Sequence, residues 1–239
     1  MLHDQHQKDC LAMSVKRLWL LRPFILSGLV LLAACGQDGF EVLAPLPAAQ
    51  IQALGVESPL KTVHFRDKDG EGLLVLSRSD GQATDEETAE DVDKVVLIAT
   101  LYGRTTADDP FKSRWQIDNE TTCAGLDLDV GFYLDATGAS DLNNDGVAEL
   151  TIVSHAFCGG GIDPQAIVVE LREGPAYYAI EGTSLVSVPG EEAYGGERKD
   201  SPSLKNASKV LRDHLETVWN SVYKRPWSHI DGSSDGAGQ

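Results

Sequence analysis

The sequence predicts a mainly β protein of the α+β class, built as an antiparallel β meander with a C-terminal amphipathic helix packed on it. Short β-branched and aromatic runs recur from residue 61 to residue 188, and Gly, Asn and Asp separate them. A helical periodicity first appears after Ser201. No internal repeat is visible, which argues against a β-propeller because that fold needs several similar blades.

The first 34 residues have the layout of a secretory signal peptide. A basic start, an apolar run over residues 24–32 and small residues precede Cys35. The segment Leu32-Ala33-Ala34-Cys35 resembles the bacterial lipobox, which implies that Cys35 is acylated and becomes the new N-terminus. An ordinary signal peptide with a chance cysteine is the alternative. The polar residues before Met13 are unusual for a signal peptide, so translation starts at either Met1 or Met13.

A lipidated cysteine would anchor the chain in a membrane, since several acyl chains together bind stably. By resemblance to lipoproteins that lack aspartate after the cysteine, Gly36 favours the outer membrane, with the protein facing the periplasm or the cell surface. Residues 35–59, rich in Ala, Pro and Gly, are expected to form a flexible tether. Residues 60–228 are expected to form one globular domain, and residues 229–239 a disordered tail.

The chain is strongly acidic, with a formal net charge of -17. Without residues 1–34 it keeps 16 basic and 35 acidic residues, a net charge of -19. Such a charge argues against binding nucleic acid or anionic lipid headgroups. It suits cations or a basic protein partner, although solubility alone would also explain it.

Two cysteines remain in the predicted domain, Cys123 and Cys158. In an oxidising compartment two such cysteines are expected to form a disulfide. A zinc site is less favoured, because neither has a second cysteine two to four residues away. On the chain-entropy model, closing a loop of this length stabilises the fold by roughly 4 kcal/mol.

The strands follow in order along the domain. The pattern predicts strands over residues 61–67, 73–79, 94–104, 113–120, 148–157, 165–173 and 175–188. Turns are expected at Asp69-Gly70 and around Gly174, and the acidic segment 80–93 is expected to be a mobile loop. Pro202 suits the first position of the helix, whose apolar face repeats at Ala207, Leu211, Leu215, Val218 and Val222.

The stretch "DLNNDGVAE" has the spacing of a calcium loop. Oxygen ligands would come from Asp141, Asn143, Asp145, the carbonyl of Val147, and Glu149, and Gly146 allows the sharp turn. An EF-hand would also need Glu at position 12, where Ile152 stands, and a helix where a strand follows. The loop is therefore expected to hold structural Ca²⁺ rather than to act as a sensor. An Asx-rich turn without metal is the alternative.

Several segments together resemble a family of bacterial exported proteins labelled surface polysaccharide biosynthesis proteins. They are "VHFRDKDGEGLLVLSR", "WQIDNETTCAGLDLDVGFYL", "SDLNNDGVAELTIV", "CGGGIDP" and "YYAIEGTS", between Leu60 and Trp227. The most specific residues are Trp115, Asp118, Cys123, Asp127, the loop and Cys158. The resemblance implies the Cys123–Cys158 bridge, a cation-type loop and a link to surface polysaccharide.

These observations favour a non-enzymatic outer-membrane lipoprotein, a binding or assembly module with an envelope protein or polysaccharide as partner. No catalytic residue can be assigned from the sequence, and His155 is expected to be a packing residue. One alternative is a glycan hydrolase using a pair from Asp118, Asp127, Asp129 and Asp135, because such enzymes need two carboxylates. Another is an acidic inhibitor of a basic cell-wall hydrolase.

Overall fold

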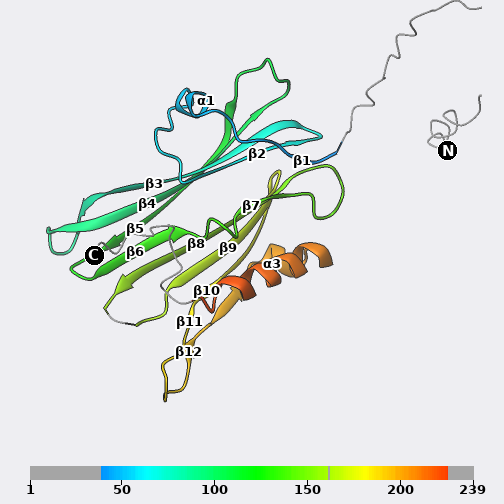
Figure 1. Ribbon diagram of the computed structural model, residues 1–239. Coiled ribbons are helices and arrows are strands. Elements are labelled where there is room, and N and C mark those ends of the chain that lie inside the picture. The colour runs from blue at the N-terminus through cyan, green and yellow to red at the C-terminus, as the bar shows by residue number, and fades with distance from the viewer. Residues whose placement is uncertain (1–38, 161, 226–239) are drawn as a thin grey trace, which may run out of the picture. The chain divides into compact units, whose positions relative to one another are not determined.

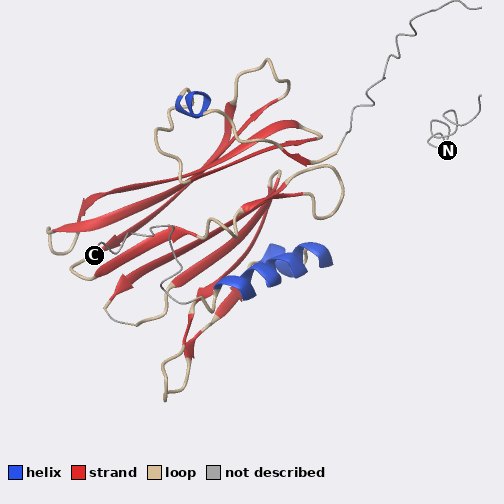
Figure 2. Cartoon of the chain, viewed as in Figure 1, coloured by secondary structure: helices blue, strands red, loops and turns tan. Residues whose placement is uncertain are grey.

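The computed structural model describes residues 39–160 and 162–225. The predicted signal peptide, Cys35, Gly36 and the tail 229–239 lie outside these residues. Within the described ranges, no helix is both long and apolar enough to cross a membrane. The predicted class is confirmed: the chain is mainly β, all strand pairs are antiparallel, and a helix packs near the C-terminus (Figures 1 and 2).

The first sheet has five strands in the order β1-β2-β3-β4-β5. It is a simple meander, because each strand from β2 onward pairs with the next along the chain. Its strands are β1 (Glu41–Val42), β2 (Lys61–Asp67), β3 (Gly70–Thr84), β4 (Asp91–Arg104) and β5 (Lys112–Cys123). The β2–β3 turn falls at Lys68-Asp69, one residue before the predicted Asp69-Gly70, and Gly70 is the first residue of β3.

The second sheet has the order β13-β10-β9-β8-β6, and β7 also pairs with β8. Its strands are β6 (Asp127–Phe132), β7 (Gly138–Ser140), β8 (Glu149–Gly159), β9 (Ala166–Glu173), β10 (Ala176–Thr183) and β13 (Arg198–Asp200). A small hairpin of β11 (Leu185–Val186) and β12 (Tyr194–Gly195) follows β10. The sequence pattern missed β6, whose "DLDVGF" mixes acids and glycine with apolar residues.

One hydrophobic core lies between the two sheets. Leu74, Leu76 and Leu97 of the first sheet pack with Val130 and Ile152 of the second. Side chains alternate across each strand, so the other face of each sheet needs its own cover. Short α1 (Ala48–Gln52) supplies this cover for the first sheet, where Ile51 packs on Leu73 and Val75.

The outer face of the second sheet is covered by α3 (Lys209–Val222), as Figure 1 shows. Leu211, Leu215, Trp219 and Val222 are buried there, so the helical face agrees with the predicted periodicity, widened by Trp219. The predicted helix is interrupted, however. A separate turn, α2 (Pro202–Lys205), comes first, with Ser201 as its N-cap and Pro202 at the first turn.

The acidic segment differs from the expected loop over residues 80–93. Strand β3 continues to Thr84 and β4 begins at Asp91, with Thr84 paired to Asp91. Only residues 85–90 form the hairpin tip, where the carboxylate of Asp85 accepts hydrogen bonds from the backbone of Glu87 and Thr88. Backbone pairing therefore extends the hairpin despite the acidic composition.

The expected tether also differs in part. Strand β1 pairs with β2, and Ile51 of α1 is only 4% exposed. Leu46, Leu54 and Val56 pack beside it on the first sheet. Burial of these apolar side chains outweighs the turn-forming composition, so the folded unit begins well before residue 60.

Candidate functional site

The Asp-rich loop joins β7 to β8 and folds around its own backbone amides. Asn144 and Gly146 take positive φ angles of 58° and 82°, which produce the sharp turn. The amide of Asp145 donates to Asp141 Oδ1 (3.0 Å) and to Asn143 Oδ1 (2.9 Å). The amide of Gly146 donates to Asp141 Oδ2 at 3.1 Å. Oxygens of loop positions 1 and 3 thus converge, as both the calcium and the Asx-turn interpretations require.

Glu149 is position 9 of the loop and the first residue of β8. Its surroundings bear on the choice between the calcium and the Asx-turn interpretations. Its side chain is fully buried, and Oε2 accepts the amide of Leu142 at 2.7 Å. Oε1 is buried without a hydrogen-bond partner among the described residues. The pKa of Glu149 is raised to about 7, mainly by burial and also by the charges of Glu173 and Asp141, against the opposing effect of the Leu142 hydrogen bond. A carboxylate in this position needs either a proton or a cation.

The donor set fits a hard cation, because every predicted ligand is an oxygen. Asn143 directs its amide nitrogen to Glu173 Oε1 at 2.9 Å, which turns its oxygen toward the loop. In the described ranges, no three His, Cys, Asp or Glu side chains are gathered closely enough to hold a metal ion. Asp141, Asp145 and Glu149 would therefore have to move closer together to complete a coordination shell.

The loop also connects the two sheets. Ala148 N–H donates to Asp67 Oδ2 at 3.1 Å, and the amide of Lys68 donates to the carbonyl of Gly146 at 2.8 Å. The ammonium of Lys68 reaches the carbonyl of Asp145 at 3.2 Å. These bonds hold the β2–β3 turn of the first sheet against the entry to β8 of the second.

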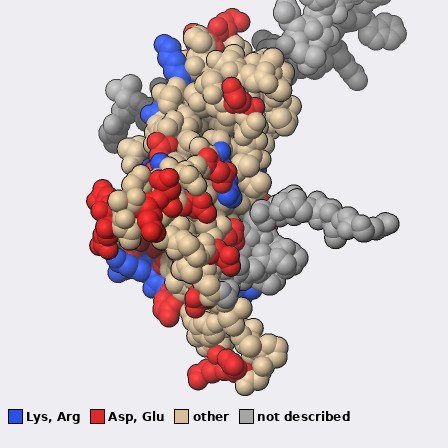
Figure 3. Space-filling model, turned by 90° about the vertical axis from the view of Figure 1, so that its left-hand side faces the viewer, with Lys and Arg blue, Asp and Glu red and all other residues tan. Residues whose placement is uncertain are grey.

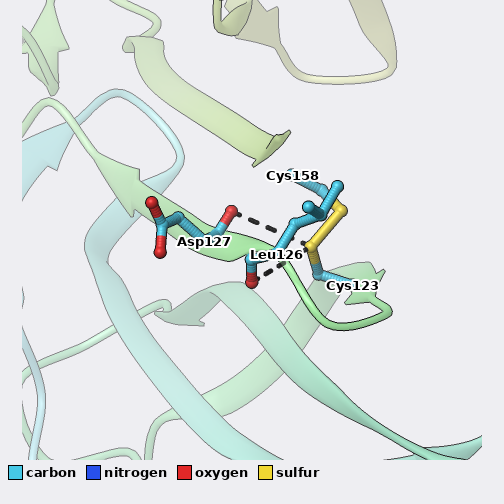
Figure 4. Close-up of a disulfide and its surroundings, with 4 residues drawn as sticks. All are labelled: Cys123, Leu126, Asp127 and Cys158. Carbon is cyan, nitrogen blue, oxygen red and sulfur yellow. Dashed lines mark hydrogen bonds between the residues drawn. A yellow bond between two sulfur atoms is a disulfide. The ribbon is translucent and has the colours of Figure 1, made fainter. Parts of the chain in front are cut away.

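Cys123 and Cys158 join the sheets at the other end of β8. Their sulfurs are bonded at 2.08 Å, with a Cα–Cα distance of 5.5 Å (Figure 4). Cys123 ends β5 and Cys158 lies near the end of β8, so the bond links the edge strand of the first sheet to the second. Strand β8 is therefore tied to the first sheet by hydrogen bonds where it begins and by the disulfide where it ends.

A pocket of about 220 Å³ borders the Asp-rich loop between the sheets. Val147 and Ala148 form one wall, and Trp115 and Arg172 line another. Further lining comes from the β2–β3 turn, including Asp67 and Asp69, and from Phe65, Glu71, Gly72, Leu101, Tyr102, Arg114, Leu150 and Gly174. The lining combines aromatic rings, guanidinium groups and carboxylates, a mixture that suits a polar ligand with an apolar face.

Two of the charged groups in this pocket are already neutralised by the protein. Glu71 is bound by Arg66 (2.9 Å), by Arg104 (2.9 Å) and by His64 (3.3 Å). Burial alone would raise the pKa of Glu71, but these hydrogen bonds lower it to about 2. Arg172 pairs with Glu170 at 3.4 Å. It also lies over the rings of Trp115 and Tyr177, at 5.3 and 4.8 Å from their centroids.

The four carboxylates considered for glycan hydrolysis have different surroundings. Asp118 accepts a hydrogen bond from Gln116, Asp135 binds Arg225 at 2.8 Å, and Asp127 is exposed. Asp129 faces His155 Nε2 at 3.4 Å and accepts a bond from Gln165. The hydrogen bond from His155 holds the pKa of Asp129 below its usual range.

His155 is buried and packs edge-on against Tyr133. Its Nδ1 atom has no hydrogen-bond partner in the described part of the chain. The histidine therefore has a carboxylate on one nitrogen, and no hydroxyl or thiol bonded to the other. The packing role of His155 stays a prediction.

Acidic side chains gather on the face of the molecule shown in Figure 3, with a few basic side chains among them.

Comparison with family models, with curated protein sequences and with solved structures finds no match to this chain. The resemblance to the surface polysaccharide proteins therefore stays a prediction.

Sequence reasoning placed the loop and the two cysteines but did not find the pocket. Its residues come from hairpins that are distant along the chain. Trp115 was singled out by resemblance, Val147 as a metal ligand, and Asp69, Gly70 and Gly174 only as turn residues. One local signal was available in "SRW", where an arginine adjoins a tryptophan in an otherwise polar strand. Nothing in that signal indicates which opposing segment faces it.

Proposed function

We propose that this chain is a lipid-anchored, non-enzymatic binding module of the bacterial outer membrane, linked to surface polysaccharide, with a structural Ca²⁺ in its Asp-rich loop. The observation that carries the proposal is Glu149, a fully buried carboxylate with one oxygen unpartnered in the described structure. It lies in a loop of oxygen donors beside a pocket of about 220 Å³. A bound cation would neutralise that charge. It would also stiffen the wall formed by Val147 and Ala148.

The anchor and the location are supported by the lipobox-like segment ending in Cys35. The binding role is supported by the mixed lining of the pocket and by the ties at both ends of β8, which favour a rigid site. A hydrolase is a weaker proposal, because retaining and inverting mechanisms both need two carboxylates facing one bond. Asp118, Asp129 and Asp135 instead have separate partners.

Calorimetric titration of the full chain with Ca²⁺ tests the metal. Wild type is expected to release heat and to melt at a higher temperature with Ca²⁺ than with a chelator. Asp145→Ala should lose both effects, whereas Glu57→Gln, an exposed acid far along the chain from the loop, should keep them. The metal assignment is wrong if wild type shows no heat at millimolar Ca²⁺ and melts identically with chelator.

Polysaccharide binding is tested separately. The full chain, immobilised through its C-terminus, is expected to retain anionic surface polysaccharide in the presence of Ca²⁺ and to release it with chelator. Retention of neither anionic nor neutral polysaccharide would contradict the binding role, whatever the metal result.

A further inference from the structure

A β-bulge in β5 changes which side chains meet in the pocket. Leu101 pairs with Trp115 and Tyr102 with Ser113, so Arg114 is the extra residue of the bulged strand. In a regular strand consecutive side chains point to opposite faces. Here Arg114 and Trp115 both line the pocket, since a bulge redirects side chains and is common beside binding sites.

Two glycines make room for side chains that line the pocket, Gly103 for Arg114 and Gly72 for Phe65. A Cβ at Gly103 would lie 1.9 Å from Nε of Arg114, and one at Gly72 would lie 2.1 Å from the Phe65 ring. The Arg114 guanidinium and the Phe65 ring therefore lie against bare backbone. The resulting volume of about 220 Å³ is below the range of about 300–1,000 Å³ that is typical of drug-sized ligands. It suits one small unit.

Arg114 is the cation available to a ligand. It has neither an ion pair nor a hydrogen bond with any described residue. Arg172, in contrast, is paired with Glu170, and Arg104 is bound to Glu71. A second pocket, of about 340 Å³, shares Arg114 and adds Lys112. Asp109 lines that second pocket as well, so Arg114 and Lys112 are local cations beside one carboxylate in a chain with a net charge of -17.

The other lining residues can recognise parts of a ligand besides its negative charge. Trp115 is half-buried and lines the pocket with Arg172 over its ring, and the rest of the indole can contact C–H groups. The exposed Asp69 carboxylate can accept hydrogen bonds from hydroxyl groups. A sugar ring carries both kinds of group. Its carboxylate or phosphate would complement Arg114 through a charge-assisted hydrogen bond.

We propose that the pocket formed by Arg114, Trp115 and Asp69 binds one anionic sugar residue. The acidic group lies on Arg114, the ring packs against Trp115, and a hydroxyl donates to Asp69. This inference deepens the proposed function by naming the ligand class, and it rests on that function only for the biological source of the sugar.

Titration of the ¹⁵N-labelled full chain with glucuronic acid, followed by NMR in the presence of Ca²⁺, tests the site. The indole N–H signal of Trp115 is expected to shift, with glucose binding at least about tenfold more weakly because it lacks the charge. Arg114→Gln should weaken glucuronic acid binding about tenfold and leave glucose unchanged. Lys205→Gln, an exposed charge on α2, is the matched control and should change neither.

Three outcomes would overturn the inference: no shift at the Trp115 indole at millimolar sugar, equal affinity for glucose and glucuronic acid, or unchanged affinity in Arg114→Gln. Inorganic phosphate binding as tightly as glucuronic acid would also overturn it, since the site would then recognise only an anion. Ca²⁺ titration of the same samples separates the two proposals. If Ca²⁺ binds normally but sugar causes no Trp115 shift, only the sugar site is refuted. If sugar shifts the Trp115 signal but no Ca²⁺ binds, only the metal assignment is refuted.

Discussion

Glu149→Gln tests the physical role of the Asp-rich loop. Glutamine has nearly the same shape and can still accept the Leu142 amide, but it carries no charge at any pH. The folded protein holds the pKa of Glu149 at about 7, compared with an ordinary value of 4.5. Below pH 4.5 the side chain is protonated in both folded and unfolded chains, so burial adds no ionic cost.

As the pH rises from 4.5 to 7, the unfolded chain loses this proton while the folded chain retains it. Wild type without metal therefore loses stability across that interval, by about 3 kcal/mol at 1.36 kcal/mol per pKa unit. The full value applies because the side chain is completely buried. At about pH 8 the variant is expected to be up to about 3 kcal/mol more stable than wild type, or about 6–12 °C in Tm. At about pH 4 the difference attributable to charge should vanish.

Urea unfolding followed by tryptophan fluorescence, with chelator present, measures this difference at both pH values. Glu57→Gln, an exposed glutamate, is the matched control and should show little change. Excess Ca²⁺ should stabilise wild type and not the variant, because it binds the ionised carboxylate. A stability difference between wild type and Glu149→Gln that is equal at both pH values would refute the buried-charge argument.

Three further predictions concern the fold and the anchor. Replacing both Cys123 and Cys158 by serine should lower the free energy of unfolding by roughly 4 kcal/mol, measured by urea unfolding under non-reducing conditions, and an unchanged midpoint would contradict the bridging role. Leu215→Ala removes a fully buried side chain and should lower the free energy of unfolding by about 2–5 kcal/mol. Val210→Ala, at a position 40% exposed on the same helix, should lower it far less, and equal losses would argue against the docking of α3 on the sheet. Cys35→Ser should abolish acylation, seen by mass spectrometry, and move the protein from the membrane to the soluble fraction; retention in the membrane fraction would refute the lipobox assignment.

Most strands were predictable because their signals are local. The run "KTVHFRD" became β2 with the expected bounds, and the turn at Gly174 separates β9 from β10. Alternation and turn chemistry act over a few residues, so a short window contains them. Strand β13 is polar and β6 mixes acids and glycine with apolar residues, so both have weak local signals. They form where a neighbouring strand offers backbone partners.

The packed segment 43–56 could not be predicted from its composition either. Pro, Ala and Gly in residues 43–56 indicate a tether when only composition is considered. The outer face of the first sheet exposes Leu73 and Val75 until Ile51 covers them. The need for that cover arises only after the sheet has formed.

The amino-acid order alone was sufficient for the mainly β class, the helical face, the loop spacing and the two cysteines that lie close enough to bond. Each depends on the identity and spacing of residues within one short segment or on a simple count. The burial of Glu149 and the meeting of Arg114 with Trp115 and Asp69 depended on the tertiary structure. They require two sheets to pack at one register and β5 to bulge at one position, and the free energy that selects this arrangement is spread over contacts between distant segments.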